Sequence, residues 1–347
     1  MQVWTRQGGL ALAVVGLLLY YCKKMGSARR VVRVGSRKSP LALVQTEFVI
    51  EKLREIRPDL VYVVVLTDTK GDQILDKPLV AIGDKGLFTH ELETHMYNKT
   101  IDIAVHSCKD LQTTLPPKLC IGAFLSRHEK EDVFIARQDL RDQVRSISDL
   151  PPGSVVGTSS LRRRAVLAHH YPHLEFKDIR GNIGTRLKKL DDVANGYSGT
   201  ILAHAGLRRM NDESYTSRVT EVLKEDKYMY AVAQGILAVE CRSDDQWTLD
   251  LLKNIADPLT TQVALAERAL LRGLEGGCHV PLAVRTATTD DTITLTGAVY
   301  SLDGQEHVQH TMTAPLAEAE QLGARVADHL ATEGAKEILA ALHAEKK

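Results

Sequence analysis

The sequence has few cysteines, and none of them are arranged in pairs. Its 347 residues include five, and no two stand at a C-x-x-C spacing. An odd number of widely spaced cysteines argues against a disulfide framework and against a zinc site, and it is typical of a reducing compartment. The five are Cys22, Cys108, Cys120, Cys241 and Cys278.

The chain also lacks net charge. It has 44 lysines and arginines against 44 aspartates and glutamates. No bulk field therefore attracts nucleic acid or a membrane surface, and any anion site must come from a local cluster. The apolar fraction of 44% and the charged fraction of 25% are ordinary for a globular protein. At roughly 100–200 residues per domain, the length predicts two or three domains.

Strongly apolar runs are missing apart from residues 9–21, which Arg6 precedes and Lys23 and Lys24 follow. This run is shorter than the ~20 residues that span a bilayer comfortably. It is similar to a signal-type or anchor-like segment. Alternatively, the given sequence starts upstream of the true start site, and Met25 is the first residue of the protein. Both interpretations stay open. Residues 1–28 are therefore treated as an N-terminal extension outside the fold. The rest of the chain predicts a cytoplasmic protein.

From Val31 onward, apolar runs typical of buried strands alternate with segments of helical periodicity, which predicts α/β domains with parallel sheets. Strands are predicted at 31–34, 62–66, 101–106, 132–136, 155–157, 174–179 and 200–203, and a strand-like segment around a turn at Gln234-Gly235 is predicted at 229–240. Helices are predicted at 41–54, 88–97, 161–170 and 182–190. The polar stretch 67–87 is long for a loop in a compact domain, which predicts a lid or binding loop.

After Asp257 the pattern changes. Asp257 as N-cap and Pro258 at the first helical position predict a helix, which apolar Val263, Ala266, Leu270 and Leu274 continue. Three strand candidates (282–287, 292–301 and 307–313) and alanine-rich helices from about Leu316 follow. The predicted fold class is therefore two α/β domains plus a small C-terminal α+β domain.

Cys278 stands between the predicted helix and the first of these strands, beside Gly276 and Gly277. Glycines favour a left-handed helix stop, and here they leave room for a bulky group on the cysteine sulfur. A lone cysteine in such a turn is more often a small buried hydrophobe. Both interpretations stand on these residues alone.

The sequence has neither the G-x-G-x-x-G nor the G-x-x-x-x-G-K-[ST] phosphate motif. It has instead three turns, each between a strand and a helix, that carry arginine: Gly35–Ser39, Gly157–Arg163, and Arg180–Asn182 with Arg186 beyond. Helix N-termini attract anions, and arginine binds carboxylates through a planar fork. Each arginine alone would be a solvated surface residue. Together with Arg208 and Arg209, the three turns predict a ligand with several acidic groups.

Two shorter patterns allow different interpretations. His90 and His95 are five residues apart and leave a common helix face, so the segment fails the H-E-x-x-H zinc motif and is predicted as a solvated helix face. Lys109 and Asp110 follow a buried strand. They are either a surface pair of little energetic value or a crevice site whose carboxylate stabilises a cation or moves a proton.

Five segments, in this order along the chain, together resemble the porphobilinogen deaminase family, also called hydroxymethylbilane synthases. The segments are Val34–Ala42, His106–Leu111, Val156–Arg163, Ile179–Leu187 and Leu274–Pro281. The resemblance runs from about Arg33 to the C-terminus, and several separate motifs in the right order make it specific.

The resemblance implies a three-domain transferase whose first two domains are like periplasmic binding proteins. It deaminates and polymerises four porphobilinogen molecules head-to-tail on a covalent dipyrromethane cofactor and releases hydroxymethylbilane for haem synthesis. Each porphobilinogen loses ammonia to give an electron-poor azafulvene, which the terminal pyrrole attacks. The implied domains are 29–128 with 229–253, then 129–228, then 254–347. A monomer that uses neither metal nor nucleic acid is also implied.

The resemblance further implies the site residues. Cys278 matches the cysteine joined to the cofactor by a thioether, and Asp110, with Lys109 beside it, matches the catalytic aspartate that stabilises the developing cation. The residues that match cofactor contacts are Lys109, Ser159, Arg162, Arg163 and Arg186. Those that match substrate contacts are Arg37, Ser39, Gln45, Arg180, Arg186 and Arg209.

The sequence departs from the family pattern at a few positions. Cys108 replaces a leucine, and Ala233, Ile236 and Ala238 fill a segment that is usually rich in glycine. Two alternatives therefore stand beside the active enzyme: a non-catalytic anion-binding protein, which has no use for the Cys278 domain, and a degenerate deaminase, which steady-state turnover would reveal.

Overall fold

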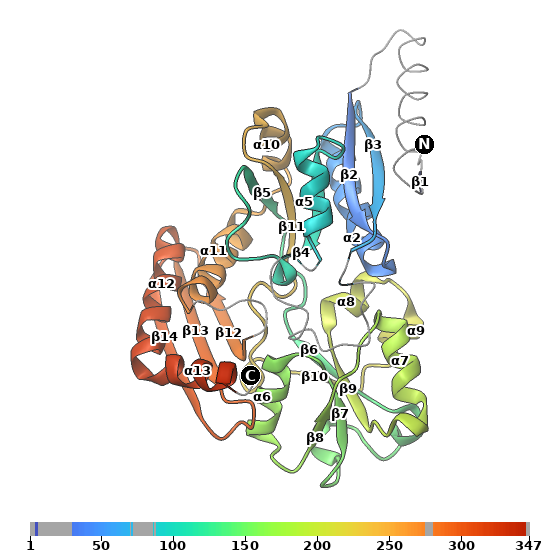
Figure 1. Cartoon of the computed structure of the whole chain (residues 1–347), viewed down its shortest axis with the longest axis vertical. Coiled ribbons are helices and arrows are strands. Elements are labelled where there is room, and N and C mark those ends of the chain that lie inside the picture. Colours follow the sequence, from blue (N-terminus) through green and yellow to red (C-terminus); the bar gives the residue numbers. More distant parts are fainter. Residues whose placement is uncertain are drawn as a thin grey trace.

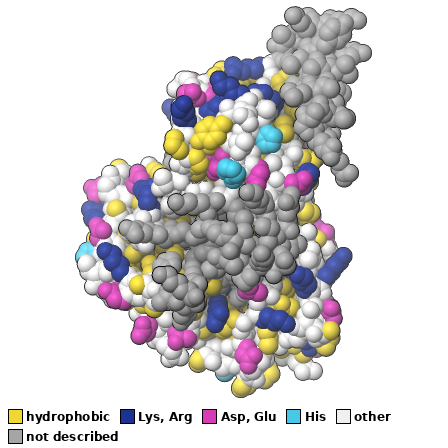
Figure 2. Space-filling model, in the orientation of Figure 1, with side chains coloured by type: hydrophobic (Ala, Val, Ile, Leu, Met, Phe, Trp, Pro, Cys, Tyr) yellow, Lys and Arg dark blue, Asp and Glu magenta, His cyan; other side chains and the backbone are white. Residues whose placement is uncertain are grey.

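The computed structural model of the chain describes residues 4–5, 30–69, 71, 86, 88–274 and 280–344. These residues form three sheets, each covered by helices (Figure 1). On the face shown in Figure 2, acidic and basic side chains are interspersed over the described surface, as the zero net charge leads one to expect. The predicted fold class, two α/β domains and a small C-terminal α+β domain, is confirmed.

The first sheet has six strands in the order β1-β3-β2-β4-β11-β5. β2 pairs in parallel with β3 and β4, whereas β11 runs antiparallel between β4 and β5 although it comes from far along the chain. Helices α2 (Pro40–Ile56), α5 (His90–Tyr97) and α10 (Gln246–Lys253) pack on this sheet. The strands are β1 (Trp4–Thr5), β2 (Val31–Arg37), β3 (Val61–Thr67), β4 (Ile103–Ser107), β5 (Leu119–Phe124) and β11 (Leu237–Arg242).

The second sheet has the order β10-β6-β9-β7-β8, with β7 parallel to both β8 and β9. Its strands are β6 (Asp132–Ala136), β7 (Val155–Gly157), β8 (Glu175–Lys177), β9 (Gly199–Ala203) and β10 (Glu221–Leu223). Its helices are α6 (Leu161–His170), α7 (Ile183–Asp191), α8 (His204–Arg209) and α9 (Glu213–Thr216). Phe134, fully buried, anchors one of its two apolar clusters.

The third sheet is an antiparallel meander of β12 (Leu282–Thr288), β13 (Thr292–Tyr300) and β14 (His307–Pro315). It packs against α11 (Pro258–Gly273) and α12 (Ala319–Leu330), and α13 (Lys336–Ala344) ends the described chain. The predicted cap is confirmed, because Asp257 Oδ1 accepts a hydrogen bond from the backbone N–H of Thr260 at 2.7 Å. The predicted apolar face is confirmed as well, since Val263, Ala266, Leu270 and Leu274 are all buried.

Glu267 of α11 connects this domain to the rest of the chain. Its fully buried carboxylate accepts hydrogen bonds from Arg127 Nη1 at 2.7 Å, from the backbone N–H of Ala233 at 2.7 Å and from Thr286 Oγ1 at 2.7 Å. Because these partners lie on three distant segments, one side chain fixes the helix against both the strand β12 and the connection that leads to β11.

The predicted turn at Gln234-Gly235 is confirmed, since Gly235 has a φ of +87° and β11 begins only at Leu237. Before the turn the strand prediction is wrong, because Tyr230 makes only an isolated bridge to Val284. A second prediction is wrong in part. The segment His90–His95 is not a solvated face, since Leu92 and Glu93 are buried in it. Burial raises the pKa of Glu93, whose carboxylate accepts a hydrogen bond from Thr89 Oγ1 at 2.6 Å.

Some predictions concern parts of the chain outside the described residues. These are the apolar run 9–21, most of the polar stretch 67–87, and the turn with Gly276, Gly277 and Cys278. Within the described ranges, no helix combines the length and the apolar character needed to cross a bilayer. The domain boundaries stay a prediction.

Candidate functional site

One cleft lies between the first and the second sheet. It has a volume of about 570 Å³ and is lined by residues that follow the carboxyl ends of β2 and β4 on one side and of β7, β8 and β9 on the other. Such strand ends are where open α/β sheets bind ligands. Nine predicted site residues line it: Arg37, Ser39, Gln45, Lys109, Asp110, Ser159, Arg163, Arg180 and Arg186.

The first-sheet side is built by the turn between β2 and α2. Ser39 caps α2, where its side chain accepts a hydrogen bond from the backbone N–H of Ala42, and Pro40 occupies the first turn. Arg37 ends β2, with its guanidinium 4.4 Å from the centre of the Phe88 ring. Gln45 Nε2 donates to Ser107 Oγ at 2.9 Å and so connects α2 to the end of β4.

Lys109 and Asp110 form a single 3₁₀ turn, Cys108–Asp110, directly after β4. Desolvation, together with the positive charge of Arg163, lowers the pKa of Lys109 to about 8. Asp110 is exposed in the cleft and makes no hydrogen bond within the described part of the chain. Asp110 therefore presents its carboxylate to whatever enters the cleft.

The second-sheet side contributes four of the predicted residues, Ser159, Arg163, Arg180 and Arg186. Ser159 Oγ donates to the carbonyl of Ile179 at 3.2 Å, which ties the end of β7 to the next turn. Asn182 caps α7 and so fixes the turn that carries Arg180. Arg186 Nε donates to the Gly181 carbonyl at 2.7 Å, and desolvation, aided by the charge of Arg163, lowers the pKa of Arg186 to about 10.

Arg162 and Arg163 share one buried carboxylate. Arg162 Nη2 lies 2.6 Å from Asp132 Oδ2, and Arg163 Nη2 lies 2.7 Å from Asp132 Oδ1. Burial opposes ionisation of Asp132, but the two guanidinium groups hold its pKa well below the usual range. Arg163 lines the cleft, whereas Arg162 does not and donates to the Met229 carbonyl at 3.0 Å. The two neighbours thus have different surroundings.

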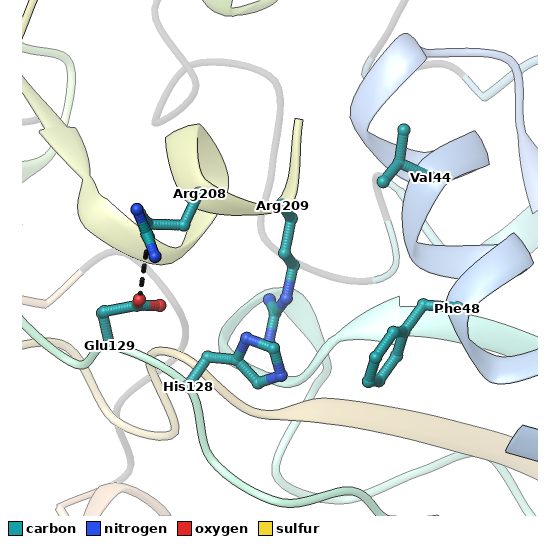
Figure 3. A pocket seen from close by; sticks show the side chains of 6 residues that line it. All are labelled: Val44, Phe48, His128, Glu129, Arg208 and Arg209. Atoms are coloured by element: carbon teal, nitrogen blue, oxygen red, sulfur yellow. Dashed lines mark hydrogen bonds and ion pairs between the residues drawn. The ribbon is translucent and has the colours of Figure 1, made fainter. Parts of the chain in front are cut away.

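Arg209 lies at a different cavity. It lines a separate space of about 230 Å³ with Val44, Phe48, His128, Glu129 and Arg208 (Figure 3). Arg209 Nη2 donates to the Gly235 carbonyl at 2.5 Å, and desolvation lowers the pKa of Arg209 to about 10. The structure therefore places Arg209 together with Arg208 and apart from the predicted anion-binding residues that line the cleft. Cys278 cannot be located, since it is outside the described residues.

The prediction missed several residues of the cleft and its support. Asp68, Phe88, Ser107, Met210 and Tyr215 also line the cleft. Behind it, Asp132 carries the paired arginines. Ser107 ends the strand that directly precedes Lys109 and Asp110, and this position could have revealed that residue. Nothing in the local sequence shows that Asp132 meets two arginines about 30 residues further along the chain.

The electrostatics of the cleft define a class of protein. Six cationic side chains line it, at Arg37, Lys38, Lys109, Arg163, Arg180 and Arg186. Of the two acidic residues there, Asp68 pairs with Lys38 and Asp110 stands exposed. This arrangement suits a ligand with several carboxylates and would place one carboxylate against it, as expected of an enzyme that stabilises a cation on a polyanionic substrate.

Comparison with known proteins identifies the family. The family model described as "porphobilinogen deaminase, dipyromethane cofactor binding domain" matches residues 32–250, and that for the C-terminal domain of porphobilinogen deaminase matches residues 261–332. The chain belongs to the porphobilinogen deaminase family. These enzymes are hydroxymethylbilane synthases, which carry a dipyrromethane cofactor and join porphobilinogen molecules head-to-tail in tetrapyrrole synthesis.

Relatives match over nearly their whole length. Porphobilinogen deaminase of Nostoc sp. is 48% identical over 321 residues, which cover 92% of this chain and 97% of the relative. That of Dictyostelium discoideum is 44% identical over 320 residues, covering 90% and 96%. Among solved structures, the periplasmic VFT2 domain of Bordetella pertussis BvgS aligns with a TM-score of 0.40 at 13% identity, over 68% of this chain and 89% of that one.

Proposed function

We propose that the cleft between the first two sheets holds the growing pyrrole chain by its carboxylates and that Asp110 acts on the reacting ring. Each pyrrole of the substrate carries two carboxylates, an acetate and a propionate. The six cationic side chains of the cleft supply partners for several of them. The observation that carries the proposal is the exposed carboxylate of Asp110 in the same cleft as these cations.

The cleft residues fit the dipyrromethane cofactor by their chemistry. Lys109, Ser159, Arg163 and Arg186 would hold its carboxylates, and Cys278 would carry the thioether. Arg163 Nε is buried without a hydrogen-bond partner among the described residues, so it keeps a donor for an acidic group. When bound, the cofactor supplies the terminal pyrrole on which the chain grows. Arg162 supports this site through Asp132 rather than from within the cleft.

Asp110 has two tasks in this scheme. Loss of ammonia from porphobilinogen leaves an electron-poor ring, and a fixed carboxylate beside it stabilises the developing positive charge. Its oxygens also accept hydrogen bonds from pyrrole N–H groups, which orients the ring. Arg37, Ser39, Gln45 and Arg180 would bind the incoming substrate, with Arg186 between substrate and cofactor. The position of Arg209 supports a role for that residue at the neighbouring cavity.

The test of Asp110 is steady-state turnover. We expect Asp110→Asn to lower kcat by more than about 100-fold, as loss of a preorganised charge does, and to leave the melting temperature unchanged because the side chain is exposed. Asp68→Asn is the matched control, since Asp68 lines the same cleft but pairs with Lys38. Equal kcat values for Asp110→Asn and the wild type would refute the role given to Asp110.

The test of Cys278 is the intact mass of the purified protein. The wild type should carry an extra mass equal to two linked pyrrole units, and Cys278→Ser should not. An unmodified wild type, even after incubation with porphobilinogen, would favour the non-catalytic anion-binding alternative. A modified but slow enzyme would favour the degenerate deaminase and direct attention to Ala233, Ile236 and Ala238, which are all buried and fill core rather than cleft.

We also propose that the chain acts as a monomer in the cytoplasm and that its reaction uses neither metal nor nucleic acid. The free thiols of Cys108, Cys120 and Cys241 support a reducing compartment. Light scattering during size-exclusion chromatography tests the monomer, and a mass near twice 38.3 kDa would contradict it.

A further inference from the structure

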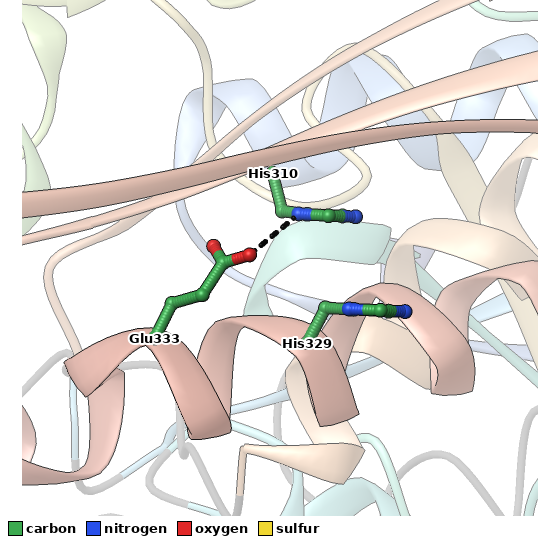
Figure 4. Close-up of side chains that lie close together, drawn as sticks. All are labelled: His310, His329 and Glu333. Carbon is green, nitrogen blue, oxygen red and sulfur yellow. Dashed lines mark hydrogen bonds and ion pairs between the residues drawn. The ribbon is translucent and has the colours of Figure 1, made fainter.

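The C-terminal domain holds three metal-binding side chains, none of which belongs to the cleft. His310, His329 and Glu333 each bring one ligand atom to within 4.8 Å of the other two (Figure 4). The rings of His310 and His329 are parallel, with centroids 4.4 Å apart and an interplanar angle of 1°. His310 Nδ1 lies 3.0 Å from Glu333 Oε1. We call these three residues the histidine cluster.

The sheet sets the direction of His310. On the edge strand β14, the less exposed residues alternate at Val308, His310, Met312 and Ala314. His310 stands opposite Gly297 of β13, and residues directly opposite each other share a face of the sheet. A Cβ on Gly297 would meet Leu270, Val326 and Leu330 of the covering helices. The His310 side chain therefore lies on the helix-covered face, where the sheet edge leaves it 24% exposed.

The helix supplies the other two ligands. His329 is near the end of α12, and Glu333 is four residues further, so both lie on one face. Directly after Glu333 the helix kinks at Gly334, whose φ of 111° is not helical, and α13 follows from Lys336. Side chains from two elements of secondary structure thus converge on one point at the surface.

We propose that the histidine cluster binds one divalent transition-metal ion, with Zn²⁺ as its best ligand. Imidazole nitrogen and carboxylate oxygen are zinc ligands, and three of them leave a fourth position for water. Ligand atoms around a tetrahedral zinc ion lie roughly 3.3 Å apart, given bonds of about 2.0–2.2 Å. Small rotations of these partly exposed side chains bring the three atoms to that spacing. The bound ion ties the end of α12 to the edge strand β14.

The experiment is a Zn²⁺ titration of chelator-treated full-length enzyme by isothermal calorimetry, with thermal unfolding in parallel. We expect one ion per chain and a rise in Tm with zinc, because an ion that binds only the folded state stabilises it. His329→Gln and Glu333→Gln should each raise the Kd for Zn²⁺ by more than about tenfold. Loss of a residue that only supports a metal ligand can already cost that much affinity, and these substitutions remove a ligand itself. His173→Gln, at an exposed histidine outside the cluster, is the control.

Two outcomes would overturn the proposal. One is the absence of any calorimetric or Tm response of the wild type to Zn²⁺. The other is a binding event that survives in a His310→Gln, His329→Gln double variant and disappears in Cys120→Ser, since Cys120 and Cys241 bring their sulfur atoms to 3.9 Å. Thermal unfolding without zinc shows whether each variant is folded. If a histidine variant is not, Glu333→Gln, whose side chain is 41% exposed, carries the test.

Discussion

Lys109 Nζ donates a hydrogen bond to Gln234 Oε1 over 3.3 Å. Gln234 lies in the segment just before β11, which returns to the first sheet, so this segment holds Lys109 in the cleft. Gln234 is buried, and its Nε2 donates to Asp132 Oδ1 at 2.9 Å. One amide therefore connects Lys109 to the carboxylate that holds Arg162 and Arg163. The position of the cleft cations depends on this shared support.

The first prediction concerns pH. In the chain without cofactor, the pKa of Lys109 is lowered to about 8, so Lys109 is positive below that pH and neutral above it. We expect the rate at which cofactor-free enzyme acquires dipyrromethane to fall as the pH rises through about 8, because one cationic anchor is lost. Lys109→Arg should move this fall to higher pH, since arginine stays charged.

The measurement is the pH profile of cofactor acquisition, followed by intact mass. Lys188→Arg is the control, because Lys188 is exposed on α7 and does not line the cleft. A profile for Lys109→Arg that coincides with that of the wild type would show that another group titrates.

The second prediction separates Arg162 from Arg163. We expect Arg162→Ala to lower the free energy of unfolding by about 3 kcal/mol or more, because it removes one partner of a buried charge pair. Arg163→Lys keeps a positive charge near Asp132 but loses the planar guanidinium. It should slow cofactor acquisition more than Arg162→Lys does, because Arg163 lines the cleft and Arg162 does not. Urea unfolding and intact mass measure the two effects.

The neighbouring Arg164 supplies the control, since it is exposed and its replacement by alanine should change stability by less than about 0.5 kcal/mol.

The pH dependence of the stability that Asp132 contributes has a definite sign. The pKa of Asp132 is depressed in the folded state, so its contribution to stability is present above the unfolded pKa of about 3.9 and is lost as the pH falls below it. Equal stability of Arg162→Ala and Arg164→Ala would contradict this account.

The third prediction uses two glycines. Gly235 has a φ of +87°, and a Cβ there would lie 2.7 Å from the His128 carbonyl oxygen and 2.8 Å from that of Glu129. Gly153 has a φ of +78° with nothing within 4 Å. Gly153→Ala should cost about 1 kcal/mol, which is the conformational penalty alone. Gly235→Ala should cost clearly more, because the backbone must also move.

Chemical denaturation of both variants measures the difference. If the two substitutions cost the same, the contact with the carbonyl oxygens contributes nothing, and the left-handed conformation explains the whole effect.

The fourth prediction concerns Glu267. Glu267→Gln removes the anionic partner of Arg127, a side chain that is itself mostly buried. This loss should lower the free energy of unfolding by about 3 kcal/mol or more. Glu320→Gln is the control, because the Glu320–Arg272 pair is exposed and such pairs contribute little. The two variants are compared by urea unfolding. A smaller loss for Glu267→Gln than for Glu320→Gln would contradict the connecting role of Glu267.

The sequence predicts most of the fold because helical and strand periodicities and capping residues are local signals. The turns that carry Arg37, Arg163 and Arg186 were predictable for the same reason. The common carboxylate of Arg162 and Arg163 was not, because Asp132 reaches them only through the order of β6, β9 and β7 in the sheet. Glu93 was wrongly assigned to a solvated face, since local polarity does not show that the helix packs on the first sheet. The histidine cluster likewise depends on strand register.

The place of β11 in the first sheet has a consequence for synthesis of the chain on the ribosome. β4 and β5 come from residues 103–124, but the strand that lies between them ends only at Arg242. Every strand of the second sheet, from Asp132 to Leu223, leaves the ribosome before that point. The second domain can therefore complete its sheet first. Until β11 is synthesised, more than a hundred residues after β5, the facing edges of β4 and β5 in the first domain remain unpaired.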